Sequence, residues 1–171
     1  MSDNANQEVT PTNFQRFGKW LIEEFKKPAG HTGFWCYLVV VGILVGGIGV
    51  WISIYRDRTW LSVVGSLLTY FPAIAAASCF ELVHADKHPE PKFARNVAIF
   101  SAATLGLAAV LISTNPPGFL TCLFGSLASL FALALWWLAN ANNPTLRDDP
   151  IASVGGDASA APAGQKGDFN V

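Results

Sequence analysis

The sequence predicts an all-α membrane protein with four transmembrane helices, arranged as two helical hairpins. The first observation is composition: 51% of the 171 residues are hydrophobic and only 13% are charged, whereas soluble domains carry about 25% charged residues. The second is that the apolar residues form four blocks without Asp, Glu, Lys, Arg or His, at residues 34–55, 60–80, 96–114 and 119–138. Each block is long enough to cross the roughly 30 Å hydrocarbon core as a helix. We therefore expect a four-helix transmembrane domain over residues 34–138.

Charged residues beside the blocks predict the orientation of the chain. Apart from Lys166, which is far from the blocks, the basic residues on the side that holds both termini are Arg16, Lys19, Lys26, Lys27, Lys87, Lys92, Arg95 and Arg147. The other side has only Arg56 and Arg58. Because basic residues accumulate on the cytosolic side of membrane proteins, we expect a bacterial inner (plasma) membrane protein with both termini in the cytosol. The outer connections, residues 56–59 and 115–118, are short turns that offer little surface to a soluble ligand.

Tryptophan residues mark the expected membrane interfaces. The indole ring favours the headgroup level, where the ring is buried and its N–H stays hydrated. The tryptophans near the ends of the apolar blocks are Trp35, Trp51, Trp60, Trp136 and Trp137. Their positions agree with the four predicted spans.

The cytosolic N-terminal arm, residues 1–33, contains a predicted amphipathic helix over residues 12–27. The apolar residues that fall within an arc of about 80° on its helical projection are Phe14, Phe17, Leu21 and Phe25. The charged residues that point away from this arc are Arg16, Lys19, Glu23 and Lys27. Thr12 and Gln15 form a predicted capping box, and Pro28 ends the helix. We expect this helix to lie in the inner-leaflet headgroups; the alternative is a helix packed on the cytosolic end of the bundle.

The composition changes after Leu138. Residues 139–171 are rich in Gly, Ala, Ser, Pro, Asn and Asp. They have too little apolar surface to offset the entropy lost on ordering. We expect this cytosolic tail to be disordered.

Small residues recur along the apolar blocks at helical spacing. The residues predicted to form helix–helix contacts are Gly42, Gly46, Gly49, Ala73, Ala77, Ala102, Gly106 and Gly125. Small side chains let helix backbones approach closely, which drives helix association in lipid. The dense glycine cluster between Gly42 and Gly49 further predicts a homo-oligomer.

One stretch between the second and third blocks resembles a metal site in its residue types. Glu81, His84 and His88 are spaced i, i+3 and i+7, and Glu-x-x-His is half of a di-iron motif. No other block supplies the second half of such a motif, and Pro89 disfavours helical geometry at His88. Polar residues must also resume where a helix leaves the membrane. We therefore expect a solvated helix end with no metal and no cofactor, and keep the three residues as the candidate ligands.

The blocks contain no ionisable residue of the kind that ion-coupled transporters place near the midplane, which argues against such a transporter. The net charge of −1 gives no reason to expect nucleic acid binding. We expect a non-catalytic protein that anchors or senses for a cytosolic protein partner. By size and topology alone, immunity, exclusion and phage-defence accessory roles are compatible. The alternatives are a pore-forming or membrane-perturbing effector, and a metal-dependent membrane enzyme using Glu81 and His84. The other expected partners are the lipid bilayer and further copies of the chain.

Overall fold

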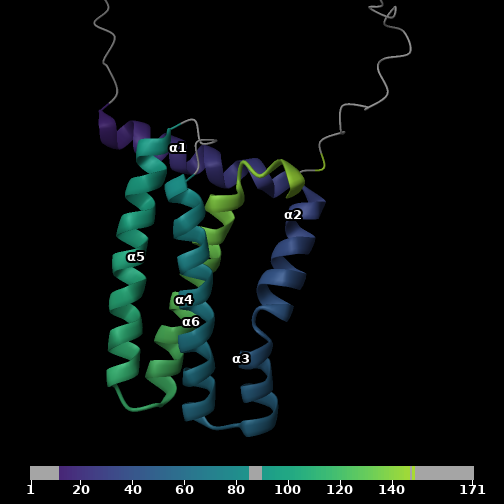
Figure 1. The fold of residues 1–171 in the computed structure, drawn as a ribbon, viewed down its shortest axis with the longest axis vertical. Helices are drawn as coiled ribbons and strands as arrows, with labels where there is room; N and C mark the ends of the chain where they lie inside the picture. Colours follow the sequence, from purple (N-terminus) through teal and green to yellow (C-terminus); the bar gives the residue numbers. More distant parts are fainter. Residues whose placement is uncertain (1–11, 85–89, 147, 149–171) are drawn as a thin grey trace, which may run out of the picture.

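The computed structural model describes residues 12–84, 90–146 and 148, and every regular element within these residues is helical. Three helices are long and apolar enough to cross a membrane: α4 (Trp60–His84), α5 (Pro91–Thr114) and α6 (Phe119–Asn140). The number rises to four if the bent pair Asn13–Gly30 and Thr32–Val45, which meet at 91°, forms one span. The chain therefore has the architecture of a helical membrane protein (Figure 1).

Helices α4, α5 and α6 form a three-helix core in which α4 contacts both other helices. The buried residues that α4 contributes are Val64, Phe71, Ala75 and Leu82. Those from the other two helices are Ala94, Ala98, Leu105 and Ile112 of α5 and Ala128, Ala132, Leu135 and Leu138 of α6. Small residues make this packing close: a Cβ added at Gly125 would lie 3.1 Å from Leu67 Cδ1. Pro72 lies inside α4, which continues past it as one helix.

The first apolar block folds as several helical pieces in line rather than as one regular α-helix. These pieces are α2 (Thr32–Tyr37), the π-helix η2 (Leu38–Val45), α3 (Ile48–Ile52) and the π-helix η3 (Ser53–Asp57). They lie in one row beside the three-helix core (Figure 1). The apolar pattern at 34–55 does not predict this subdivision.

The break between η2 and α3 falls at two glycines. The Gly46 N–H donates to Val41 O at 2.8 Å, a π-type bond, and a Cβ on Gly46 would lie 2.6 Å from Gly42 O. The indole Nε1 of Trp51 donates to Ile43 O at 3.0 Å. The Ile43 carbonyl near the break thus also accepts from a side chain. Backbone groups inside a membrane must find their hydrogen-bond partners within the protein.

Side-chain hydroxyls join this first segment to α4. The Tyr70 hydroxyl donates to Gly42 O at 2.8 Å. Nearer the turn, the buried Ser53 hydroxyl lies 2.7 Å from Ser66 Oγ and 3.0 Å from Ser62 Oγ. These hydrogen bonds between hydroxyl groups join the start of η3 to α4.

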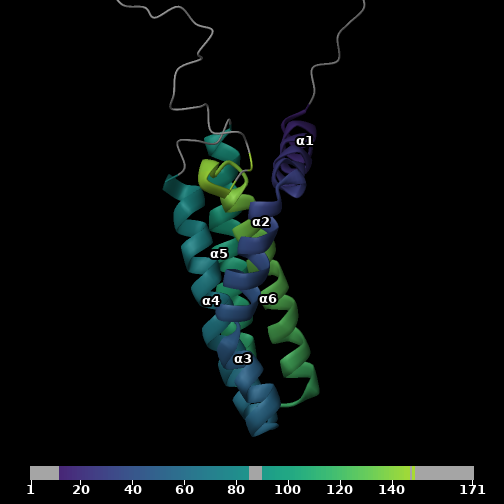
Figure 2. The same ribbon diagram turned by 90° about the vertical axis from the view of Figure 1, so that its right-hand side faces the viewer.

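Helix α1 (Asn13–Lys26) lies across one end of the molecule, and the 3-10 helix η1 (Lys27–Gly30) leads from it into α2. Both views show α1 at this end, roughly perpendicular to the long helices (Figures 1 and 2). Thr12 and Gln15 form the capping box, and Trp20 and Glu24 are the buried residues of the helix. We call this the α1 end; the opposite, turn end carries the connections 58–59 and 115–118.

The helices extend past the predicted blocks at the α1 end. Helix α4 continues to His84, and α5 begins at Pro91, a residue type well suited to the first helical position. Residues 139–146, expected to be disordered, include the last residues of α6 and the 3-10 helix η4 (Pro144–Leu146). Except for Asp148, the remaining tail lies outside the described residues.

Candidate functional site

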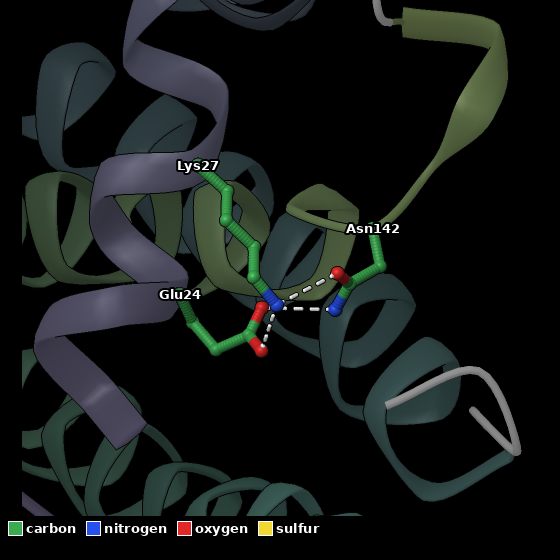
Figure 3. A network of polar contacts seen from close by, with 3 residues as sticks. All are labelled: Glu24, Lys27 and Asn142. Atoms are coloured by element: carbon green, nitrogen blue, oxygen red, sulfur yellow. Dashed lines mark hydrogen bonds and ion pairs between the residues drawn. The ribbon is translucent and has the colours of Figure 1, made fainter. Parts of the chain in front are cut away.

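A polar cluster of Glu24, Lys27 and Asn142 joins the N-terminal arm to the end of α6 (Figure 3). The Lys27 ammonium lies 2.5 Å from Glu24 Oε1 and donates to Asn142 Oδ1 at 3.1 Å. The Asn142 amide donates to Glu24 Oε2 at 2.8 Å. Both carboxylate oxygens therefore have partners, and we call these three residues the polar clasp.

Burial makes the polar clasp energetically important. The Glu24 side chain is 1% exposed, and that of Lys27 is 33% exposed. A buried carboxylate is costly unless it is paired and hydrogen-bonded. Each partner of Glu24 therefore stabilises the fold chiefly by keeping the buried carboxylate paired. If α1 left this position, the Glu24 carboxylate would lose these partners.

Two further contacts fix the corner between α1 and α2. The Trp137 indole donates to Phe25 O at 3.1 Å, and the Trp35 indole donates to Ala29 O at 3.0 Å. The rings of Trp35 and Trp137 pack edge to face at 4.8 Å between centroids. Phe34 lies against Trp137 at the same distance. Aromatic packing and hydrogen bonds together hold the arm against α6.

The chain after α6 returns to the same corner. The Asp148 carboxylate accepts from the backbone N–H groups of Thr32 at 2.5 Å and Gly33 at 3.1 Å. These are unpaired donors at the start of α2, so Asp148 satisfies them. The Asp148 N–H donates to His31 Nδ1 at 3.2 Å.

The other half of α1 contacts the start of α5. Phe17 packs edge to face on Phe93 at 5.6 Å, and Trp20 lies 5.9 Å from the same ring. Arg16 forms an exposed ion pair with Glu90 at 3.0 Å. Helix α1 is thus attached to both α5 and α6.

Two residues of the predicted 12–27 helix, Lys27 and Trp20, have other surroundings than the helical projection predicts. Lys27, expected to point away with the charged face, instead contacts Glu24 and Asn142. Trp20, outside the predicted apolar arc, is 5% exposed, whereas Phe14 within that arc is 83% exposed. On the helical projection Glu24 lies only about 20° from Phe17. This position on the apolar face was the feature of the sequence that could have indicated the burial of Glu24. It could not identify Asn142 as the partner.

The candidate metal ligands lie at the exposed end of α4. Glu81 and His84 are exposed, and the His84 ring lies 4.1 Å from that of Phe80 with its Nδ1 2.9 Å from Phe80 O. Within the described residues, no three His, Cys, Asp or Glu side chains come together as a metal site. His88 lies outside those residues.

The predicted packing residues fall into two groups. Gly125 is buried against Leu67, while added Cβ atoms at Gly42 and Gly46 would lie 3.5 Å from Leu133 Cδ2 and 3.4 Å from Tyr70 Cε2. The members that are exposed within one chain are Gly46, Gly49, Ala73, Ala77, Ala102 and Gly106. Their contact with another copy stays a prediction.

The predicted interface tryptophans also differ in exposure. Trp35, Trp51 and Trp60 are exposed, whereas Trp136 and Trp137 are half-buried against Phe34. Phe17 and Leu21 of α1 are half-buried as well. The aromatic residues of α6 therefore serve intramolecular packing in addition to any contact with lipid.

No protein-family model, curated protein or solved structure matches the chain. The arguments for function therefore come from the placement of its residues.

Proposed function

We propose that this chain is a non-catalytic protein of a bacterial inner membrane, with a cytosolic α1 end that binds a cytosolic protein partner. The observation that carries the proposal is the unequal distribution of polar structure. Within the described residues, the α1 end carries an extra helix, the polar clasp and the segment that reaches Asp148. The turn end carries only the connections 58–59 and 115–118.

The placement of the α1 end in the cytosol is supported by charge. Helix α1, η1 and the first turn of α5 contain most of the basic residues, whereas Arg56 and Arg58 lie at the turn end. Basic residues are retained on the cytosolic side during insertion. Both termini would then lie in the cytosol.

We further propose that α1 lies in the inner-leaflet interface. Its 91° angle to the following segment suits a helix parallel to the membrane surface when that segment crosses the bilayer. Phe14 is 83% exposed and Ile22 56% exposed, so lipid would cover apolar surface that the protein leaves open. Lys19 and Glu23 have side chains that are 79% and 59% exposed, and would face the cytosol.

The polar clasp suits a docking role because it orders α1 before a partner arrives. An ordered surface avoids the entropic cost of folding on binding. The exposed face with Lys19 and Glu23 offers both charge signs to a protein partner. Assembly into a homo-oligomer would multiply this surface, and the exposed small residues of the outer helix faces support such assembly.

Site-specific photocrosslinking in cells tests the partner proposal. A photoreactive residue at Lys19 should capture one cytosolic protein, because Lys19 is exposed on the proposed docking face. The same probe at Asn115, on the turn end, is the matched control. The charge reversal Glu23→Lys should weaken the Lys19 crosslink severalfold without changing expression. If Lys19 yields only lipid or further copies of the chain, the partner proposal is wrong.

A further inference from the structure

An apolar groove of about 630 Å³ lies between α1 and the α5–α6 hairpin. Helix α1 lines it with Phe14, Phe17 and Leu21, and the hairpin lines it with Phe93, Phe100 and Phe131. The volume lies within the roughly 300–1,000 Å³ of ligand sites. The groove is therefore large enough to hold a substantial apolar group.

The groove continues into the membrane-spanning part of the hairpin. A second groove of about 800 Å³ lies between α5 and α6 and reaches the connection 115–118. Phe131 lines both grooves, so they share one wall. An elongated apolar ligand could thus enter under α1 and extend along the hairpin.

Polar and basic groups lie at the α1 end of the groove. Asn13 and Asn96 are among its lining residues. Lys92 lies one helical turn before the lining Asn96 on the same face of α5, and Arg16 lies one turn after the lining Asn13 on α1. Arg16 is paired with Glu90, whereas Lys92 is exposed and forms no ion pair within the described residues. This rim is complementary to an anionic headgroup.

The other occupants fit less well. The chain before Thr12 reads MSDNANQEVTP, which is too polar to fill an apolar groove. A rigid transmembrane helix from a second copy would have to end below α1, because α1 itself forms part of the groove wall. A flexible acyl chain can pass between α1 and the hairpin.

We infer that this groove binds one acyl chain of an anionic phospholipid, whose phosphate is held at Lys92 and Asn96. The inference deepens the proposed function, since it rests on α1 lying in the lipid interface. It assigns α1 a second role: its apolar side encloses a bound lipid and thereby couples the arm to the membrane.

Native mass spectrometry after reconstitution tests this site. The full chain is placed in nanodiscs of equal amounts of dioleoylphosphatidylglycerol and dioleoylphosphatidylcholine, then released into mild detergent. We expect one retained phospholipid per chain, predominantly phosphatidylglycerol. Lys92→Gln should reduce that preference about fivefold, because a basic residue near anionic lipid contributes about that factor. Lys19→Gln, which removes an exposed charge elsewhere on α1, is the matched control.

A second variant fills the groove. Val97 lines the groove. Val97→Trp places a large ring in the groove wall and should abolish retention of either lipid. Circular dichroism should show that the helices persist in this variant. The inference is overturned if the wild-type chain retains no lipid, or retains both headgroups equally. It is also overturned if a cysteine at Phe131 crosslinks to a second copy and lipid is absent. Because both leaflets have the same composition and no partner is present, these outcomes do not depend on orientation or partner binding.

Discussion

At the scale of single residues, the polar clasp shows how one buried charge determines the position of a helix. Glu24 is 1% exposed, whereas Glu23 beside it is 59% exposed and forms an ion pair with Lys19 at 3.9 Å. The two side chains are chemically identical, but one is buried and the other is exposed. Comparing variants at the two positions therefore isolates the contribution of burial to stability.

Glu24→Ala should release α1 from the end of the bundle. Removing the carboxylate leaves Lys27 and Asn142 without their main partner, which we expect to lower stability by about 1–3 kcal/mol. Hydrogen exchange should accelerate at the backbone amides of residues 13–26. The measurement is hydrogen-exchange mass spectrometry with thermal unfolding in detergent.

Glu23→Ala is the control for this experiment, and should change stability by no more than about 0.5 kcal/mol. A double variant Glu24→Ala/Lys27→Ala should lose less than the sum of the two single variants, because no charge is then left unpaired. Equal effects of Glu23→Ala and Glu24→Ala would contradict the importance of the clasp.

At Glu81 and His84 we expect no bound metal. Both side chains are exposed at the end of α4, and His84 contacts Phe80. Elemental analysis of purified protein should find no stoichiometric iron or zinc, and Glu81→Gln and His84→Gln should each change stability by no more than about 0.5 kcal/mol. One metal ion per chain that disappears in Glu81→Gln would favour the metal-dependent enzyme instead.

At the scale of elements, the first apolar segment differs from the other three helices. Near its π turns and the break at Gly46 and Gly47, the side chains of Trp51 and Tyr70 donate to the backbone carbonyls of Ile43 and Gly42. The glycines of this segment thus have two distinct uses. Both Gly46 and Gly49 are exposed, but a Cβ at Gly46 would clash with Gly42 O whereas a Cβ at Gly49 would meet no close atom.

This difference gives a specific test of self-association. Gly49→Leu should weaken an oligomer without unfolding the chain, because its Cβ would find only Ser66 Oγ, at 3.9 Å. Gly46→Leu should destabilise the chain itself, because its Cβ would lie 2.6 Å from Gly42 O. Crosslinking and native mass spectrometry in mild detergent measure the first effect, and thermal unfolding measures the second. A wild-type chain that is monomeric in several detergents and in nanodiscs would remove the basis for the oligomer.

At the scale of the whole molecule, the two ends differ in structure and charge. The proposed orientation predicts that a cysteine at Glu90 is labelled only from the cytosol and one at Asn115 only from outside. Cys36, Cys79 and Cys122 are first replaced by alanine to remove background labelling. Membrane-impermeant maleimide on intact cells and on inverted vesicles provides the measurement. Labelling of both positions from the same side would contradict the four-span arrangement, because α5, which joins them, would then not cross the membrane.

The sequence by itself determined the membrane class of this protein. Four uncharged apolar blocks, each about as long as the hydrocarbon core of a bilayer, cannot all be buried by the rest of so short a chain, so lipid must surround them. It also located the helix ends Trp60, Thr114 and Phe119 at the turn end, since the turns at 56–59 and 115–118 interrupt the blocks there. The capping box at Thr12 was equally local, because its partner Gln15 is three residues away.

Only the tertiary structure decided which way α1 faces and what it contacts. The helical projection describes one helix alone, whereas the burial of Trp20 and Glu24 depends on α5 and α6. The partners Glu24 and Asn142 are 118 positions apart, and Thr32 and Asp148 are 116 apart. Such contacts arise from the packing of whole helices, so no local pattern of charge or hydrophobicity encodes them.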